Sequence, residues 1–242
     1  TLSDKQYNFG LFSGDNFDDD LYAETVFRGM AFTGVAFDTE KTADSQAIEA
    51  WGDWAKNEKS PWFGFLELTT VDNFAFSDTK GNAKEAFKKS YQSSVQQVDN
   101  ELETLFSKLD ELELNNNTIV IITSNHGTEF NETNSNTWGA STNFSRYQLQ
   151  VPMVISWPGK LPATYAHRSS HLDVSVTLLQ DLLGVSSNPT DYSSGRNIFN
   201  ERKRKWILAG DSRELALITP NQTTVIDKFG NFKLYDNHYQ RL

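Results

Sequence analysis

The chain has 242 residues, of which 38% are hydrophobic and 13% aromatic, enough apolar material for one large domain or two small ones. Its formal net charge of −10 at pH 7 argues against a nucleic-acid-binding protein, because such proteins present a basic face. The sequence contains no cysteine, which excludes disulfides and thiolate chemistry.

Membrane-spanning helices and signal peptides each have a characteristic sequence pattern. No stretch comes near the roughly 18 consecutive apolar residues of a spanning helix, so we expect no membrane span in this chain. The opening residues, TLSDKQYNFG, lack the basic and apolar regions of a signal peptide. The absence of cysteine leaves the compartment open, since a cysteine-free protein tolerates both reducing and oxidising spaces.

The first elements of the chain are an acidic segment, a helix and a strand. Residues 14–20, GDNFDDD, suggest a calcium loop but lack its glycine and its closing glutamate, which favours a solvated turn over a cation site. Residues 42–58 predict a helix with Trp51 and Trp54 on its apolar side. Residues 61–70, PWFGFLELTT, predict a buried strand.

Residues 82–110 give the clearest helix prediction. Asn82 and Glu85 form a plausible capping box at its start. Apolar residues then follow in steps of three and four: Phe87, Tyr91, Val95, Val98, Leu102, Leu105 and Leu109. This spacing predicts one continuous stripe that faces the core.

The second half alternates strands with a helix and then becomes β-rich. TIVIITS, 118–124, and VPMVISWPG, 151–159, predict buried strands, and 128–146 is polar without periodicity. Residues 173–184 predict a short helix capped by Asp173 and ended by Gly184. Short strands from 206 onward predict an antiparallel meander. The pattern indicates an α/β fold with a mainly parallel central sheet and a β-rich C-terminal tail.

Asn125, His126 and Gly127 follow directly after the strand at 118–124. Sites in open α/β sheets gather at the carboxyl ends of strands. The imidazole of His126 can ligate a divalent metal or donate a proton, and Asn125 offers a carbonyl oxygen. By spacing alone, an Asn-His pair is more often a hydrogen-bonded turn than a ligand pair.

The other candidates are the remaining histidines and one basic cluster. His171 and His238 are read as turn or surface residues, and His167 with Arg168 either meets an anion or lies in a solvated loop. The cluster ERKRK, 201–205, is either a solvated turn or a contact for lipid phosphates at a membrane surface. Its candidate residues for binding lipid or phosphate are Arg202, Lys203, Arg204 and Lys205.

Several segments resemble sulfatases and their relatives in the alkaline-phosphatase superfamily. NTIVIITSNHGTEFNE is similar to the TSD[NH]G segment of that superfamily, and YQSSVQQVDNELETLFSKL, LQVPMVISWPGK and SSHLDVSVTLLQDLLG occur in the family's order. The resemblance implies an alkaline-phosphatase/sulfatase-like α/β sandwich. It implies that residues 1–242 are the C-terminal portion of one sulfatase-like domain, with an α/β core at about 42–184 and a β-rich tail at about 206–236.

The resemblance also implies a metal site that is degenerate in this chain. In the superfamily, the two residues at the positions of Asn125 and His126 ligate a divalent cation. An amide at 125 in place of the family's carboxylate weakens affinity for a hard cation such as Mg²⁺, Mn²⁺ or Ca²⁺. The nucleophile motif of sulfatases and the substrate-side histidine are absent from the sequence, so no catalytic residue is assigned.

Within the superfamily, the chain resembles a group of inner-membrane proteins of Gram-negative bacteria with a periplasmic sulfatase-like domain. That resemblance implies a non-catalytic periplasmic module that binds or senses lipid, either lipopolysaccharide or cardiolipin. The module would regulate envelope lipid homeostasis through other inner-membrane proteins. The alternative is a metal-dependent sulfatase or phosphate-ester hydrolase whose nucleophile lies upstream of this chain.

Overall fold

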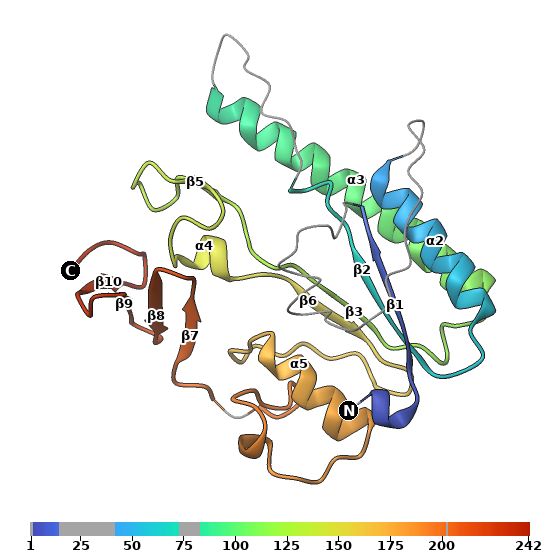
Figure 1. Cartoon of the computed structure of the whole chain (residues 1–242). Coiled ribbons are helices and arrows are strands. Elements are labelled where there is room, and N and C mark those ends of the chain that lie inside the picture. The colour runs from blue at the N-terminus through green and yellow to red at the C-terminus, as the bar shows by residue number, and fades with distance from the viewer. Residues whose placement is uncertain (1, 15–41, 73–82, 202) are drawn as a thin grey trace. The chain divides into compact units, whose positions relative to one another are not determined.

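The computed structural model describes residues 2–14, 42–72, 83–201 and 203–242, and Figure 1 draws the others as a thin grey trace. The predictions made for the acidic segment after Gly14, for Asn82 and for Arg202 lie outside the described residues. The chain divides into two compact units, Thr1–Thr118 and Ile119–Leu242. Within the described ranges, no helix is both long and apolar enough to cross a bilayer.

The first unit is built on two parallel strands, as Figure 1 shows. After a short 3-10 turn, η1 (Ser3–Lys5), strand β1 (Asn8–Ser13) pairs in parallel with β2 (Trp62–Glu67). Helix α2 (Ala43–Asn57) connects them and begins at Thr42, whose Oγ1 accepts the Ser45 N–H at 3.1 Å. The helix and strand predicted at 42–58 and 61–70 are therefore confirmed.

Helix α2 packs its apolar side on β1. Phe12 and Ile48 are fully buried, and the Phe12 ring lies 5.5 Å from that of Trp54. A methyl group at Gly10 would lie only 2.6 Å from a carbon of the Phe12 ring, so the strand needs glycine there to admit the aromatic packing. Hydrogen bonds add to this aromatic contact, because the fully buried carboxylate of Asp44 in α2 accepts the N–H groups of Thr69 and Thr70 just after β2.

Helix α3 (Ala83–Glu111) confirms the predicted helix, but the prediction of one continuous core stripe is wrong. Leu105 and Leu109 are buried at 9% and 2% exposure, whereas Val95 is 42% exposed. Helix α2 has 15 residues against 29 in α3, and a methyl at Gly52 would meet the Lys108 side chain at 3.0 Å. Helix α2 thus covers the C-terminal part of α3 and leaves the middle of the stripe open.

The second unit begins with strand β3 (Val120–Thr123), which pairs with β6 (Met153–Ser156). The pairing is antiparallel, with Ile121 opposite Ile155, and among the described residues β3 has no second neighbour. The expectation of a mainly parallel central sheet is therefore met only in part, by the parallel pair of β1 and β2. Between β3 and β6 lie β4 (Glu129–Phe130), β5 (Trp138–Gly139) and the single turn α4 (Arg146–Leu149).

The predicted helix at 173–184 is present in two parts. Helix α5 (Leu172–Thr177) continues as the π-helical η2 (Leu178–Leu182). Asp173 lies inside the first turn, so its prediction as the cap is wrong, and His171 occupies the N-cap position without a side-chain cap bond. Gly184 ends the helix with a φ of +67°, a left-handed conformation that glycine adopts without strain. A short 3-10 turn, η3 (Pro189–Asp191), follows.

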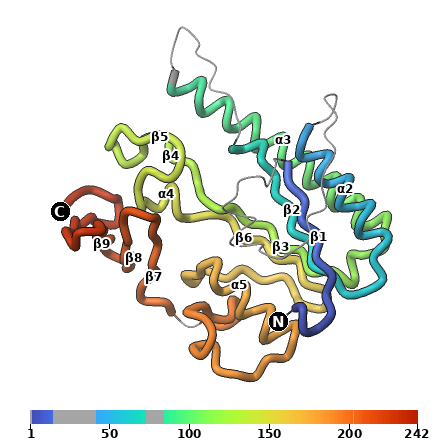
Figure 2. Tube along the Cα trace, viewed as in Figure 1, coloured from blue at the N-terminus to red at the C-terminus, as the bar shows by residue number. Residues whose placement is uncertain are grey.

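The β-rich tail forms the predicted antiparallel meander, whose path Figure 2 traces in red. Its strands are β7 (Ile207–Gly210), β8 (Glu214–Ile218), β9 (Gln222–Asp227) and β10 (Phe232–Asp236). Asp227 shapes the β9–β10 turn, because its Oδ1 accepts the N–H groups of Phe229 and Asn231. The boundary between the two units falls inside the core predicted at 42–184, so the unity of that core stays a prediction.

Candidate functional site

The end of β3 forms a tight turn that uses its own polar side chains. The Ser124 hydroxyl donates to the carbonyl of His126 at 2.7 Å, and the His126 N–H donates to Oδ1 of Asn125 at 2.9 Å. Asn125 is exposed and His126 is half-buried. Oδ1 of Asn125, the atom that a cation would use, already accepts a hydrogen bond from the backbone.

Gly127 joins this turn to the segment before β6. Its N–H donates to the Gln148 carbonyl at 2.8 Å. A methyl group at this position would lie 2.3 Å from the Tyr147 carbonyl oxygen, so any larger residue would push the two segments apart. The sequence indicated a sharp backbone turn at Gly127, and the structure shows the close approach that requires it.

His171 contacts the same strand end, which the sequence did not predict. Its Nε2 lies 3.2 Å from Oγ1 of Thr123. The single hydroxyl proton of Thr123 goes to the Pro152 carbonyl at 2.9 Å, so His171 must donate from Nε2. His171 thereby ties the N-terminus of α5 to the end of β3. The two residues are separated by 48 positions, and the sequence gave no local signal for their contact.

A buried carboxylate, Glu129, organises the loop that follows the turn. It is fully buried, and its oxygens accept hydrogen bonds from the Thr133 N–H and hydroxyl, the Asn143 and Gln148 amides and the Ser145 hydroxyl. Burial alone would raise the pKa of Glu129, but the hydrogen bonds from Thr133, Asn143 and Gln148 lower it below the ordinary value of 4.5. The carboxylate is therefore held ionised by neutral donors.

Glu129 also acts on the strand end through one intermediate residue. Gln148 donates to Glu129 from its amide at 2.9 Å, and its backbone carbonyl receives the N–H of Gly127. Its side-chain oxygen accepts the N–H of Thr142 at 2.9 Å. Sequence reasoning missed this network, because the segment 128–146 shows no periodicity and its donors are spread over many positions.

The donor set at the strand end does not fit a hard divalent cation. Such ions favour several oxygen ligands, carboxylates above all. Among the described residues, no group of three or more histidine, cysteine or acidic side chains could hold a metal. Asn125 and His126 offer one amide oxygen and one imidazole, and that oxygen is already hydrogen-bonded. These two residues could at most complete a site whose carboxylates come from elsewhere.

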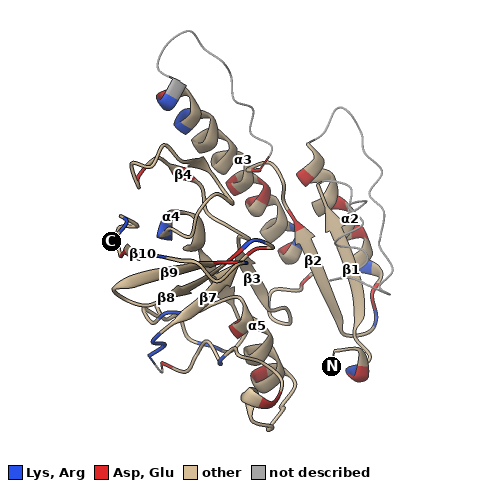
Figure 3. Ribbon diagram, turned by 60° about the vertical axis from the view of Figure 1, so that its left-hand side comes forward, with Lys and Arg blue, Asp and Glu red and all other residues tan. Residues whose placement is uncertain are grey.

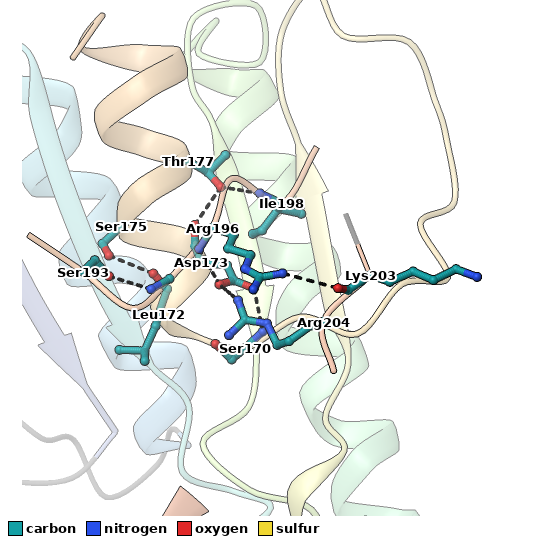
Figure 4. A network of polar contacts seen from close by, with 11 residues as sticks. Ser170, Leu172, Asp173, Ser175, Thr177, Ser193, Arg196, Ile198, Lys203 and Arg204 are labelled. Atoms are coloured by element: carbon teal, nitrogen blue, oxygen red, sulfur yellow. Dashed lines mark hydrogen bonds and ion pairs between the residues drawn. The ribbon is translucent and has the colours of Figure 1, made fainter. Parts of the chain in front are cut away.

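Arg204 of the basic cluster lies in the interior, in the network of Figure 4. Its guanidinium pairs with Asp173, and the two side chains are only 9% and 4% exposed. Asp173 also accepts the N–H groups of Ser170 and Arg196, each at 2.8 Å. One carboxylate thus joins α5 to two later segments of the chain, and the guanidinium of Arg204 is turned away from the surface.

The neighbours of Arg204 point outward. Lys203 and Lys205 are exposed, and Figure 4 shows the Lys203 side chain extending away from the network. The backbone of this segment is held by Arg204 and by a bond from Arg196 to the Lys203 carbonyl at 3.5 Å. The structure therefore presents two lysines on an anchored segment.

The other residues considered as possible site residues, Arg168, His167 and His238, each contact another residue of the protein. Arg168 donates to the Ile218 carbonyl at 3.2 Å, which ties it to the terminal sheet. His167 packs edge-on against Tyr165 at 5.8 Å. The N–H of His238 donates to Asp236 at 2.9 Å in the turn after β10. The contact of His238 uses its backbone alone, and the buried Nδ1 of His167 has no hydrogen-bond partner among the described residues.

The fold is that of an alkaline-phosphatase-type α/β protein. A solved alkaline-phosphatase-superfamily protein from Vibrio parahaemolyticus aligns with 100% of this chain and 61% of its own, with a TM-score of 0.67 and 15% identity. The phosphonate monoester hydrolase of Agrobacterium radiobacter aligns with 97% of this chain and 72% of its own, with a TM-score of 0.67 and 14% identity. These identities are informative about the fold alone.

The family model for sulfatases matches residues 3–185, so the chain belongs to the sulfatase family. It is also 32% identical, over 246 aligned positions, to the inner membrane protein YejM of Salmonella typhi. That alignment covers 100% of this chain and 39% of YejM. The chain therefore spans about two fifths of the length of this relative.

Proposed function

We propose that this chain is a non-catalytic sulfatase-like module on the periplasmic side of the inner membrane of a Gram-negative bacterium. It binds lipid, either lipopolysaccharide or cardiolipin, and helps to regulate envelope lipid homeostasis through other inner-membrane proteins. The similarity to YejM, an inner membrane protein, supports the location at that membrane. Membership of the sulfatase family supports the description of the module.

The observation that carries the non-catalytic proposal is Asn125. The resemblance to sulfatases implies a carboxylate at this position, where this chain has an amide whose oxygen accepts the N–H of His126. The loss of one negative charge lowers affinity for Mg²⁺, Mn²⁺ or Ca²⁺. Asn125 and His126 are therefore degenerate metal ligands, and any cation is bound weakly or not at all.

Lipid contact is assigned to the basic cluster Arg202, Lys203, Arg204 and Lys205. Lys203 and Lys205 supply exposed ammonium groups, which attract the phosphates of anionic lipids. Arg204 contributes by anchoring the segment to Asp173. Because the anchor holds the backbone, binding has to order only the two lysine side chains and not the segment that carries them.

The test is binding to phosphatidylcholine vesicles prepared with and without cardiolipin or lipopolysaccharide. The double variant Lys203→Ala/Lys205→Ala should bind the anionic vesicles roughly 30-fold more weakly, at about 1 kcal/mol per lysine. Lys56→Ala/Lys59→Ala removes the same charge from exposed positions in the first unit and should bind like the wild type. Equal binding by all three proteins would refute the role of the cluster.

Family membership favours one alternative, a metal-dependent sulfatase or phosphate-ester hydrolase. In that case His126 would contribute to a cation site completed by ligands and a nucleophile from outside this chain. The cation would then stabilise charge on the transferred group. Turnover by the intact protein, including the segments outside this chain, discriminates this alternative from the non-catalytic module.

A further inference from the structure

One face of the terminal sheet is apolar and open to solvent. Residues directly opposite each other in an antiparallel sheet share a face, and the registers of β7–β10 place two such rows side by side. The apolar side chains of these rows, here called the apolar face, are Leu208, Leu215, Leu217, Ile226, Phe232 and Leu234.

Three of the six side chains of the apolar face are exposed and the other three are half-buried, whereas the centre of the opposite face is buried. Leu208, Leu215 and Phe232 are 51%, 46% and 66% exposed. On the opposite face Ala216 and Val225 are 0% and 4% exposed. One face of this sheet is therefore packed against the protein, while the other exposes leucine and phenylalanine side chains to water. An exposed apolar face of this kind is typical of an interaction surface.

Basic and aromatic residues border the apolar face. Lys205 and the half-exposed Trp206 directly precede β7. At the other end of the strands, the Lys228 N–H donates to the Arg213 carbonyl, and the Lys228 ammonium lies over the ring of Phe229, which is 79% exposed. Cations and interfacial aromatic rings thus lie at both ends of an apolar surface.

Few charged residues of the tail lie on the apolar face. Figure 3 shows the strands β7, β8 and β9 mostly tan, with colour concentrated in the adjoining loops. Glu214 and Asp227 are opposite each other in register, in line with the buried face. Asp236 lies at one corner of the apolar face, where its carboxylate accepts the N–H groups of His238 and Gln240.

We propose that the apolar face docks on the surface of an anionic lipid bilayer, with Lys205, Trp206, Lys228 and Phe229 at the headgroup level. This inference rests on the proposed lipid-binding function and specifies the surface and the form of the lipid, a membrane. Leucine and phenylalanine enter the boundary of the acyl chains, while lysines reach the phosphates and tryptophan occupies the interface. The cations at both ends of the face match the phosphates of anionic lipids, and this charge complementarity favours a bilayer as the occupant.

The first experiment compares apolar substitutions on and off this face. Leu208→Ser/Phe232→Ser should weaken binding to phosphatidylcholine–cardiolipin vesicles about tenfold or more, because two large side chains no longer leave water. The matched control is Leu161→Ser/Phe106→Ser, at positions 89% and 39% exposed in other parts of the chain, and it should bind like the wild type. The loss should persist at high salt, whereas the effect of the lysine variant should shrink.

The second experiment uses the absence of cysteine from the chain. Single variants Leu208→Cys and Leu161→Cys each accept one environment-sensitive fluorophore at an exposed position. On addition of anionic vesicles, the label at 208 should shift to the blue and gain intensity, while the label at 161 should not change. Circular dichroism of each labelled protein confirms that the fold is retained.

The outcomes separate this inference from the proposed function. If the Leu208/Phe232 variant binds vesicles like the wild type while the Lys203/Lys205 variant binds weakly, docking by the apolar face is refuted and lipid binding by the cluster stands. If only the apolar variant binds weakly, the docking surface stands and the role of the cluster fails. A wild-type dimer that the apolar substitutions convert to monomers, with unchanged vesicle binding, would identify the face as an interface between copies and refute docking.

Discussion

Glu129 shows how one buried charge shapes the candidate site. A carboxylate removed from water is costly unless hydrogen bonds replace its hydration, and here Thr133, Asn143, Ser145 and Gln148 all donate to it. The same network fixes Gln148, which in turn receives the N–H of Gly127. The geometry of the turn at Asn125 and His126 therefore depends on a residue that contacts neither of them.

Glu129→Gln should destabilise the protein by about 1–3 kcal/mol at pH 7, because an amide group would place a donor where the network supplies only donors. The folded-state pKa of Glu129 is lowered. Its contribution to stability is therefore fully present above the unfolded pKa near 4.5 and is lost as the pH falls through the lower folded pKa.

The measurement is chemical denaturation of wild type and Glu129→Gln between neutral and acidic pH. The difference in the free energy of unfolding should narrow as the pH falls below 4.5. Glu132→Gln is the control, because Glu132 is exposed in the same loop. A difference that stays constant with pH would show that Glu129 is not the titrating group.

Among the elements, α5 and the tail are joined by Asp173. Its carboxylate binds Arg204 and the N–H groups of Ser170 and Arg196, so one side chain holds three segments together. Removal of one partner from a buried ion pair leaves the other charge without compensation. The position of the basic cluster therefore depends on α5.

Asp173→Ala should lower the free energy of unfolding by about 3–5 kcal/mol, measured by denaturant titration. Arg213→Ala removes a partner from an exposed ion pair with Asp211 and should have no comparable effect, since solvent screens that pair. If Asp173→Ala proved as stable as the wild type, the buried pair would not be the link between α5 and the tail.

Elements with local signals could be predicted from the sequence, and long-range pairings could not. Helix α2 and the meander follow from apolar spacing and turn residues within short windows. The antiparallel partner of β3 is 36 positions away at one end of the ladder, from Val120 to Ser156, and 30 at the other, from Thr123 to Met153, and no local pattern specifies it. Arg204 belongs to a charged run that indicates a surface, and only Asp173, 31 residues earlier, brings it inside.

At the candidate site, the sequence indicated the turn and its glycine but not the residues that hold it. Asn125, His126 and Gly127 lie directly after a predicted strand, and the structure places them there. His171 and Glu129 reach this strand end through tertiary contacts. A single sequence gives no signal for such contacts, because each depends on how separate segments pack.

For the whole molecule, the net charge of −10 opposes binding to an anionic membrane. Binding therefore requires that the basic residues be concentrated at one surface, with apolar contact to supplement them. Screening by salt reduces both the general repulsion and the local attraction, and it leaves apolar burial almost unchanged.

The most direct test is turnover of aryl sulfates and aryl phosphates by the intact protein, including the segments outside this chain, with Mg²⁺ or Mn²⁺ supplied. The amide at 125 lowers affinity for a hard cation and predicts no turnover above that of buffer, with no difference between wild type and His126→Ala. Turnover that depends on the added cation and is lost in His126→Ala would contradict the non-catalytic proposal and establish the metal-dependent hydrolase.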